Sequence, residues 1–441
     1  MRLDLTGAWS AVDAVSPFVE TGWVRRVAGG VVEATGPRLP VGALCLIDDP
    51  VATAAEVVGF REDALLLMPL GGAGGLRPGA PVRSGRVPLG VKTGPGLLGR
   101  ILDGLGEPID GRGPLPGRTQ PVVAQPPAPL ERRRIREPLV TGVRVIDGLL
   151  TCGKGQRLGI FAGSGVGKSI LLGSIARHAV ANVNVIALIG ERGREVRDFL
   201  ERDLGAALSR SVVVVATAEQ PPLVRIKAAL VALTIAEHFR DRGEDVLFMM
   251  DSLTRVVMAQ REIGLAAGEP PTTKGYPPSA FALLPGLLER VGTSRRGSVT
   301  GFFAVLVEGD DLSEPVSDAA RSVLDGHITL SRRLAHRNHY PAVDVLGSVS
   351  RVMPQVVSEV HQAAADEVRR VLAVYAEAED VINLGAYVAG SNADVDEAIR
   401  RLPAVHRFLR QRPEEGSALD DTLRGLEQLA RERGPVAVGD E

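Results

Sequence analysis

Aromatic residues are scarce in this chain of 441 residues: Phe, Trp and Tyr together make up 4% of it, whereas hydrophobic residues make up 45%. A large core is therefore possible, but it must be built mostly from Val, Leu, Ala and Ile. Only two cysteines occur, Cys45 and Cys152. They are too few and too isolated for a disulfide framework or a metal site, and this usage fits a reducing cytoplasm.

Long apolar runs and an excess of positive charge are also missing. No apolar run reaches the roughly 18 residues of a membrane helix, and the N-terminus lacks the pattern of a signal peptide. Any membrane association is therefore expected to be peripheral. The formal net charge of −2 argues against a broad nucleic-acid-binding surface. One dense basic run, residues 131–136, is interpreted as a solvated linker; contact with a partner or with anionic lipid is the alternative.

The N-terminal quarter of the chain reads as a small β-barrel. Short apolar segments at 31–34, 43–47 and 64–68 are bounded by Gly, Pro and Asp, which is typical of strands joined by tight turns. Ahead of them, apolar residues recur at helical spacing over 3–16. This segment is either a docking helix for a partner or a short helix packed on its own domain, and Gly7 weakens the helix prediction.

The middle of the chain alternates apolar runs with helical patterns, which predicts a mostly parallel, doubly wound α/β sheet. A connector rich in Gly and Pro, residues 93–150, precedes it. After Pro354 the pattern is helical almost to the end, with its longest helix at 355–378. The strands are expected at 157–161, 183–189, 211–217, 245–250, 300–307 and 326–331, and helices at 170–180, 194–203, 223–240 and 315–324.

The most informative stretch lies between the strand at 157–161 and the helix at 170–180. Small residues there let backbone N–H groups surround phosphate oxygens at the start of a helix. Lys168 supplies a positive charge for the β- and γ-phosphates, and Ser169 a hydroxyl for Mg²⁺. The strict motif has Gly at position 162, where this chain has Ala162, whose methyl group fits if φ stays negative. The phosphate-binding residues are Gly163, Ser164, Gly165, Val166, Gly167, Lys168 and Ser169.

Two carboxylates follow apolar strands and are expected at the edge of the sheet where ligands bind. Asp251 ends the strand at 245–250, a position suited to holding the water shell of Mg²⁺, or else to capping the next helix. Glu191 follows the strand at 183–189 and can orient the water that attacks a γ-phosphate. Arg192 can neutralise phosphate charge. A surface ion-pair cluster is an equally good interpretation of the Glu191–Arg192 pair from local chemistry alone.

Arg351 and Tyr340 are candidate nucleotide-binding residues only if other parts of the chain or a second subunit bring them to the site. Arg351 follows a Ser-rich turn and would ordinarily be a surface residue. In a ring of subunits it can reach the nucleotide of the next subunit as an arginine finger. Tyr340 offers an aromatic face for adenine, or else it is a core or hinge tyrosine.

Six short sequence motifs, spread over nearly the whole chain, occur in the same order as in one protein family. By these motifs the chain resembles the ATPases of bacterial type III protein export, in their flagellar or injectisome form. These are relatives of the catalytic β subunit of rotary ATP synthases. The phosphate loop and the run 274–279 lean towards the flagellar form without deciding it. The patterns lie at residues 95–103, 106–110, 190–195, 274–279, 306–311 and 339–344.

The resemblance implies an N-terminal β-barrel (22–92) after a docking helix (1–21), a RecA-like ATPase domain with its connector (93–352) and a C-terminal helical domain (353–441). It implies a homohexamer that hydrolyses ATP with Mg²⁺ to energise export across the inner membrane. Carried over by position, Lys168 and Ser169 take the phosphates and the metal, Asp251 supports the metal's water, and Glu191 is the catalytic carboxylate. Arg192 is a phosphate neighbour, Arg351 is the finger, and Tyr340 lies at the adenine.

The resemblance also implies partners. The segment 264–276 would line the central opening and meet a coiled-coil stalk protein, and the N-terminal helix would dock a stator protein that regulates the ATPase. The C-terminal domain would face export chaperones with their cargo, near the membrane export gate, and no nucleic acid is expected. Two other functions stay open: a rotary synthase β subunit, and a hexameric RNA translocase. The helical domain lacks the acidic loop of the former, and residues 22–92 lack the basic aromatic platform that the latter needs.

Overall fold

The computed structural model describes residues 20–85, 89–307 and 311–431. The helix expected at 3–16 lies outside these residues. The described residues form two compact units. One contains the residues up to Leu89 with the segments 221–224 and 259–277, and the other contains the remainder of the chain.

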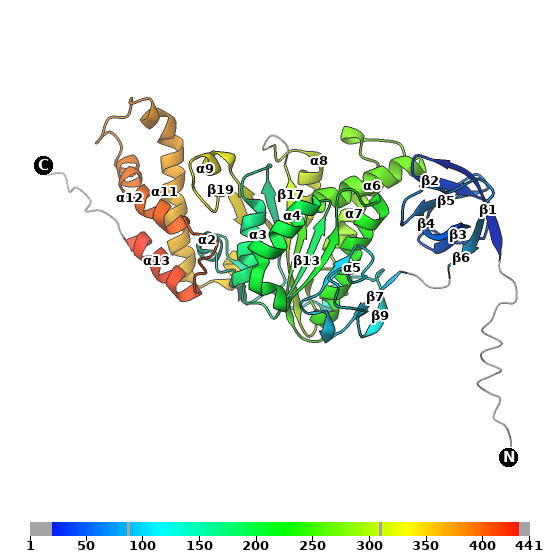
Figure 1. The fold of residues 1–441 in the computed structure, drawn as a ribbon. Coiled ribbons are helices and arrows are strands. Elements are labelled where there is room, and N and C mark those ends of the chain that lie inside the picture. The colour runs from blue at the N-terminus through cyan, green and yellow to red at the C-terminus, as the bar shows by residue number, and fades with distance from the viewer. Residues whose placement is uncertain (1–19, 86–88, 308–310, 432–441) are drawn as a thin grey trace, which may run out of the picture. The chain divides into compact units, whose positions relative to one another are not determined.

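The first unit contains the expected barrel (blue strands, Figure 1). Six antiparallel strands close in the order β1-β2-β5-β4-β3-β6. Their inward side chains are aliphatic and small, among them Val32, Ile47 and Val57, each fully buried. This alternation of inward apolar and outward polar residues explains why short strands form a barrel here. The strands are β1 (Thr21–Ala28), β2 (Val31–Ala34), β3 (Leu44–Asp49), β4 (Val51–Arg61), β5 (Ala64–Pro69) and β6 (Pro81–Ser84).

The second unit is built on a nine-stranded sheet of order β19-β18-β12-β17-β15-β13-β14-β8, with β16 (Gly292–Thr293) paired to β17. All neighbours along the order are parallel except β18 and β19, which are antiparallel. The six strands expected from the sequence are confirmed to within two residues. They are β12 (Arg157–Ala162), β13 (Val183–Ile189), β14 (Ser211–Ala216), β15 (Asp245–Asp251), β17 (Ser298–Leu306) and β18 (Gly326–Leu330).

The sequence analysis missed the two edge strands. β8 (Ile101–Asp103) lies inside the segment interpreted as a connector, and three residues are too few for a periodic signal. β19 (Val343–Ser350) is an exposed edge strand with mixed burial, so its apolar pattern is weak.

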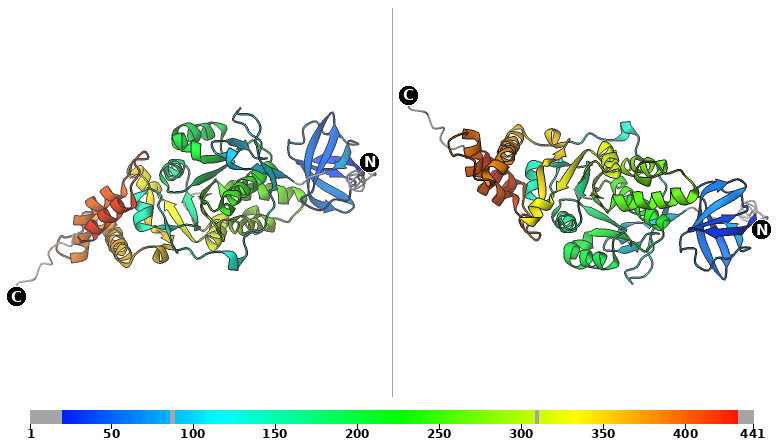
Figure 2. Two further views of the ribbon diagram at one scale, coloured as in Figure 1. Left: turned by 90° about the horizontal axis from the view of Figure 1, so that it is seen from below. Right: turned by 90° about the horizontal axis from the view of Figure 1, so that it is seen from above.

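Helices cover both faces of the sheet, as Figures 1 and 2 show, with α3 and α4 on one side and α7 and α8 on the other. Such covering is expected for parallel strands, which are buried on both faces. The helices between residues 168 and 336 are α3 (Lys168–His178), α4 (Gly193–Asp198), α5 (Pro222–Asp241), α6 (Leu253–Ala267), α7 (Pro278–Leu288), α8 (Pro315–Val323) and α9 (Arg332–His336), with helical turns η3 (Phe199–Leu204), η4 (Gly205–Arg210) and η5 (Thr273–Gly275).

The connector contains more regular structure than its Gly and Pro content suggested. Within it, the interpretation of residues 131–136 as a solvated linker is wrong for Arg132 and Arg133. Arg132 donates to the carbonyl of Val291 (3.0 Å), and Arg133 donates to the carbonyl of Ser294 (3.0 Å). Both side chains therefore fasten the connector to the region of β16. The connector contains η1 (Pro95–Leu97), η2 (Pro129–Glu131), α2 (Arg144–Leu149) and the strand pairs β7 (Gly90–Thr93) with β9 (Arg118–Pro121) and β10 (Pro138–Leu139) with β11 (Cys152–Gly153).

The C-terminal helices follow α10 (Met353–Val356) and are α11 (Glu359–Asn383), α12 (Ala393–Leu409) and α13 (Leu419–Arg431). The longest begins at Glu359 rather than 355, because Ser358 caps it by accepting the N–H of His361 (3.2 Å).

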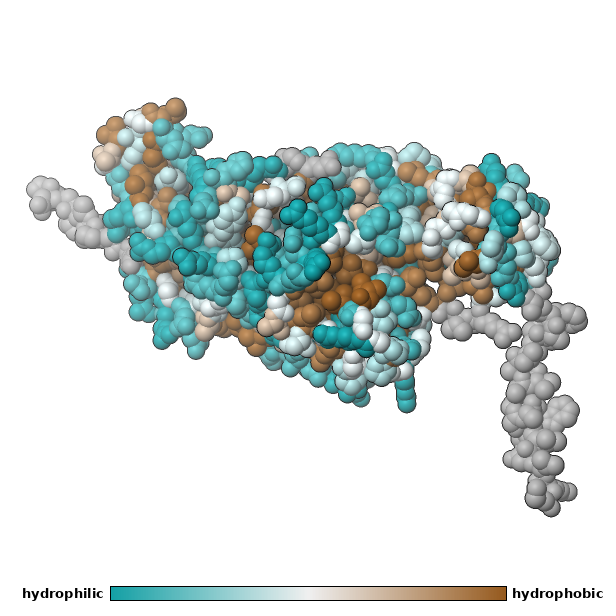
Figure 3. Space-filling view, viewed as in Figure 1, coloured by the Kyte–Doolittle hydropathy of each residue, from teal (hydrophilic) through white to brown (hydrophobic). Residues whose placement is uncertain are grey.

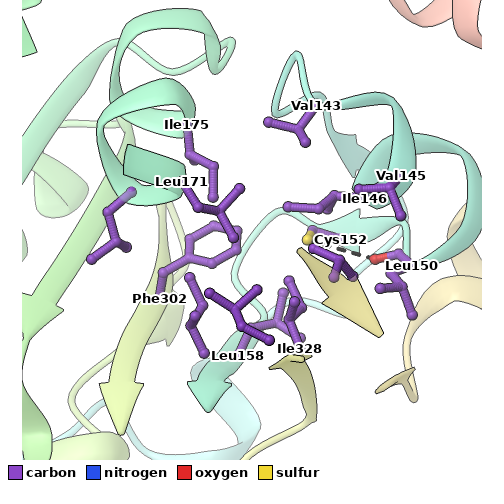
Figure 4. Packing of buried hydrophobic residues seen from close by; sticks show 14 of the residues in the cluster. Val143, Val145, Ile146, Leu150, Cys152, Leu158, Leu171, Ile175, Phe302 and Ile328 are labelled. Atoms are coloured by element: carbon purple, nitrogen blue, oxygen red, sulfur yellow. Dashed lines mark hydrogen bonds between the residues drawn. The ribbon is translucent and has the colours of Figure 1, made fainter. Parts of the chain in front are cut away.

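The C-terminal helices and the sheet share one core, in which residues of α11 to α13 are continuous with β12 and α3. Figure 4 shows part of this core around Cys152, with Leu158, Leu171 and Phe302. Cys45 and Cys152 are both buried free thiols. Within the described residues, no helix is long and apolar enough to cross a bilayer.

Candidate active site

The phosphate loop joins the carboxyl end of β12 to the first turn of α3, as the sequence predicts. Gly165 and Gly167 have φ values of +78° and +95°, a conformation that a residue with a Cβ adopts only with strain. Ala162 is the last residue of β12 and is not among the described residues with positive φ, so its methyl group is accommodated. The glycines thus curl the backbone while α3 presents its N-terminal N–H groups.

Lys168, Glu191 and Asp251 come together at this edge of the sheet. β13 and β15 are parallel neighbours, with Leu188 opposite Asp251, so Glu191 follows its strand at the same level. The Nζ of Lys168 forms an ion pair with Oδ1 of Asp251 and lies 3.6 Å from Oε1 of Glu191. The side chains of Lys168, Glu191 and Asp251 are only 10%, 18% and 5% exposed.

The electrostatics of this cluster are dominated by burial and by two carboxylates that face one lysine. Burial, followed by the negative charge of Asp251, raises the pKa of Glu191 to about 7, and the charge of Lys168 opposes this rise. A carboxyl group with a pKa near neutrality at a ligand-binding edge is suited to handle a proton or orient water.

An apolar pocket of about 170 Å³ adjoins the loop at Gly167. Tyr340 lies against the loop, because a Cβ placed on Gly167 would meet Cε1 of Tyr340 at 3.3 Å. A planar, apolar ring fits this pocket, with the tyrosine face as one wall. The other lining residues are Val143, Ile170, Leu171, Ser174, Leu330, Pro341, Ala342, Gln411, Arg412 and Pro413.

The last three of these residues escaped the sequence analysis. Gln411, Arg412 and Pro413 follow α12, about 70 residues after Tyr340 in the chain, where no local pattern indicates that they belong to the pocket. Only the packing of the C-terminal helices against α2 and α3 brings them there.

Two predicted site residues lie outside the cluster. The side chain of Arg192 is 84% exposed and lies 3.6 Å from Glu195 on the surface of α4. Arg351 lies at the opposite end of the strands, where β12 begins. Its N–H bonds the carbonyl of Asp325, and the N–H of Asp325 bonds the carbonyl of Arg157 at the start of β12. The phosphate loop follows the other end of that strand, about 16 Å away at 3.3 Å per residue.

The donors at the loop fit Mg²⁺. Ser169 is exposed on the first turn of α3, and Asp251 and Glu191 add carboxylate oxygens. Mg²⁺ prefers oxygen ligands and takes one or two from the protein, with water and phosphate completing its shell.

The site agrees with comparisons to known families. Residues 142–350 match the nucleotide-binding domain of the ATP synthase alpha/beta family, and residues 357–428 match the C-terminal domain of the T3SS ATPase EscN. The chain is 52% identical over 425 residues to the flagellum-specific ATP synthase of Bacillus subtilis, covering 95% of this chain and 97% of that one. It is 53% identical over 408 residues to the type 3 secretion system ATPase of Xanthomonas euvesicatoria, covering 91% and 92%.

Solved structures agree. The assembled ATPase EscN from the type III secretion system of enteropathogenic E. coli matches with a TM-score of 0.89 and 43% identity over 93% of this chain and 100% of that one. EscN in complex with its central stalk EscO matches with a TM-score of 0.85 at the same identity and coverage. Neither the rotary synthase β subunit nor the RNA translocase is favoured by these matches. The chain therefore belongs to the family of flagellum-specific and type 3 secretion system ATPases, the ATP-hydrolysing enzymes of type III protein export.

Proposed function

We propose that this ATPase works as a homohexameric ring in which each catalytic site is completed by the next subunit. The single observation that carries this proposal is the position of Arg351. It is separated from the phosphate loop of its own chain by the length of β12, which exceeds the reach of an arginine side chain. An arginine at the amino edge of one sheet can serve only a loop at the carboxyl edge of a neighbouring sheet.

The residues at the loop have separate tasks in hydrolysis. Backbone N–H groups from Gly163 to Ser169 surround the β- and γ-phosphates, and Lys168 turns its charge from the two carboxylates to the phosphate oxygens. Ser169 and Asp251 would hold Mg²⁺, which neutralises charge that develops on the phosphates. Glu191, with its raised pKa, orients the attacking water and accepts its proton. Tyr340 stacks on adenine.

Two arginines stabilise charge in this scheme. Arg351 of the neighbouring subunit approaches the γ-phosphate as the bond breaks. Arg192 is at the surface, and its pairing with Glu195 is exposed and therefore weak. Such a pair costs little to break, so we assign Arg192 to the phosphates as a second cation. Figure 3 shows a hydrophobic area beside the hydrophilic α4 on this face, which a neighbouring subunit would cover.

The same proposal includes the partners. EscN forms a complex with its central stalk EscO, and we assign a coiled-coil stalk of this kind to the opening of the ring, against residues 264–276. The loop there is exposed around Lys274 in η5. The N-terminal segment would bind a stator protein, and α11–α13 would face chaperone–cargo complexes. The enzyme would act in the cytoplasm at the inner membrane, next to the export gate.

The test of the shared site is complementation between two inactive variants. Arg351→Ala should bind nucleotide with normal affinity yet lose about 10³-fold in turnover at every protein concentration. Lys168→Ala lacks the loop lysine but keeps its finger. In mixed rings an intact loop can meet an intact finger, so mixing the two proteins should restore measurable hydrolysis. Arg424→Ala, at an exposed position of α13, is the matched control and should stay fully active.

Two results would contradict the proposal. One is no rescue in mixtures that are shown by crosslinking to contain mixed rings. The other is a dilute wild-type monomer that hydrolyses ATP as fast per chain as the assembled enzyme.

A further inference from the structure

One wall of the base pocket is formed by Gln411, Arg412 and Pro413, which belong to the short segment Arg410–Pro413 between α12 and α13. Its central residue, Gln411, is only 8% exposed. The N–H of Gln411 donates to the carbonyl of Tyr340 (2.9 Å). The two walls of the pocket are thus joined by a backbone hydrogen bond at Gln411.

The side chain of Gln411 bonds to the turn before α2. Its Nε2 donates to the carbonyl of Gly142 (2.7 Å) and to that of Glu415 (2.5 Å), and its Oε1 accepts the N–H of Arg144 (2.8 Å). Both the NH₂ group and the oxygen of the amide therefore have hydrogen-bond partners. A buried amide with all its partners fixes the backbone that carries it.

Two further sets of bonds hold the same segment. Arg144 donates to the carbonyl of Phe408 (3.0 Å) and also bonds Glu415 and the carbonyl of Arg410. The carbonyl of Pro413 accepts from Arg177 (2.7 Å) and from Ser174 (3.2 Å) on α3, the helix that begins at the phosphate loop. The segment therefore connects α12, α2 and α3 at the edge of the nucleotide site.

We infer that Gln411 is a positioning residue: its side chain holds the segment Arg410–Pro413 against Tyr340, so that the affinity for the base depends on this contact. Gln411 acts through the pocket wall and does not reach the reacting phosphates. The inference rests on the proposed nucleotide site and adds to it a dependence on the docking of the C-terminal helices.

Loss of the side-chain bonds should lower the fraction of molecules whose pocket is closed. The apparent affinity for a ligand that needs the closed pocket falls by that fraction, and a ligand that does not need it is unaffected. ATP uses the pocket and the phosphate loop, whereas inorganic tripolyphosphate uses the loop alone. Once ATP is bound the wall is in place, so turnover at saturation should change little.

The experiment compares Gln411→Met with Gln428→Met in the full-length enzyme. Methionine matches glutamine in length but has neither amide donor nor amide acceptor, and Gln428 is exposed on α13. We expect Gln411→Met to raise KM for ATP about tenfold, to change kcat less than twofold and to leave inhibition by tripolyphosphate unchanged. Gln428→Met should match the wild type in all three. Circular dichroism and thermal melting check that each variant folds.

The possible outcomes separate the alternatives. An unchanged KM for ATP, or an equal loss of ATP and tripolyphosphate binding, would overturn the positioning role. If Gln411→Met does not fold, Gln411→Glu serves instead, because it keeps the size but puts a carboxylate oxygen opposite the carbonyls of Gly142 and Glu415. A wild-type enzyme whose ATP hydrolysis tripolyphosphate does not inhibit would contradict the proposed nucleotide site itself and leave the bonding of Gln411 unaffected.

Discussion

Oε1 of Glu191 lies 3.6 Å from Nζ of Lys168, although the two residues belong to different strand–helix connections of the sheet. Lys168 also pairs with Asp251 on the strand next to that of Glu191. Lys168 thus faces two carboxylates. If the proposed phosphate site is right, nucleotide exchanges these partners for phosphate oxygens, so each of the three residues is expected to respond to substitution in a different way.

The substitution Glu191→Gln should preserve nucleotide binding and lower kcat by about 10²-fold or more. The amide keeps the shape of the side chain but cannot accept a proton from water. Binding of a fluorescent ATP analogue and steady-state hydrolysis together measure the two effects. A turnover close to that of the wild type would remove Glu191 from the catalytic role.

The substitution Lys168→Ala should weaken ATP binding about 10- to 100-fold and abolish hydrolysis, because a charge-assisted contact to phosphate is lost. Lys154→Ala is a suitable control, because that lysine pairs with Glu137, just before β10, and with Asp245, the first residue of β15. Titration calorimetry with ATP gives the affinities. Unchanged kinetics in Lys168→Ala would disprove the interpretation of residues 163–169 as a phosphate loop.

The substitution Asp147→Asn should lower the free energy of unfolding by about 1–3 kcal/mol. The fully buried carboxylate accepts from the N–H (2.8 Å) and hydroxyl (2.7 Å) of Thr141 and from the N–H of Gly142 (2.8 Å). An amide places its NH₂ against one of these donors. Urea denaturation measures the change, with the exposed Asp420→Asn as control. Equal stability of the two variants would contradict the assigned bonds.

Acid should destabilise the fold by forcing a proton onto the buried His339. Its ring packs edge-to-face against that of His406, with 5.2 Å between the ring centroids. Burial, then the charges of His406 and Arg410, lowers the pKa of His339 to about 4. Arg337 and Glu379 also face the pair, through His406. In the unfolded chain this histidine takes up its proton near pH 6.5, whereas in the folded chain it does so only near pH 4. The free energy of unfolding is therefore unaffected by this group above pH 6.5. It declines as the pH falls towards 4, by up to about 3 kcal/mol.

His339→Gln removes this titration, and its free energy of unfolding should therefore depend less on pH between 6.5 and 4 than that of the wild type. His336→Gln, at an exposed position of α9, should leave the dependence unchanged. Urea denaturation at a series of pH values measures both. Parallel curves for the wild type and His339→Gln would show that the proton uptake occurs elsewhere.

Much of the candidate nucleotide site could be predicted because its signals are local. A run of small residues between an apolar strand and a helix, and a carboxylate directly after a buried strand, identify Lys168, Glu191 and Asp251 one at a time. The topology of a parallel sheet then places them together without any knowledge of side-chain packing. The strands themselves were predictable for the same reason, because parallel strands buried on both faces are continuous apolar runs.

Residues whose environment comes from distant parts of the chain could not be predicted. Arg132 and Arg133 resemble solvated residues in sequence, and only the fold brings the carbonyls of Val291 and Ser294 to them. β8 became a strand because an edge was available beside β14.

The sequence by itself determined the buried parallel strands, the candidate phosphate loop and the carboxylates that face it, because these depend on local periodicity and on the chemistry of neighbouring residues. The tertiary structure alone decided that Gln411 lies beside Tyr340 and bonds its carbonyl, and that Arg351 lies a strand's length from its own loop. These are relations between segments separated by 70 residues or by the length of a strand, and they are set by how helices and strands pack rather than by any local preference.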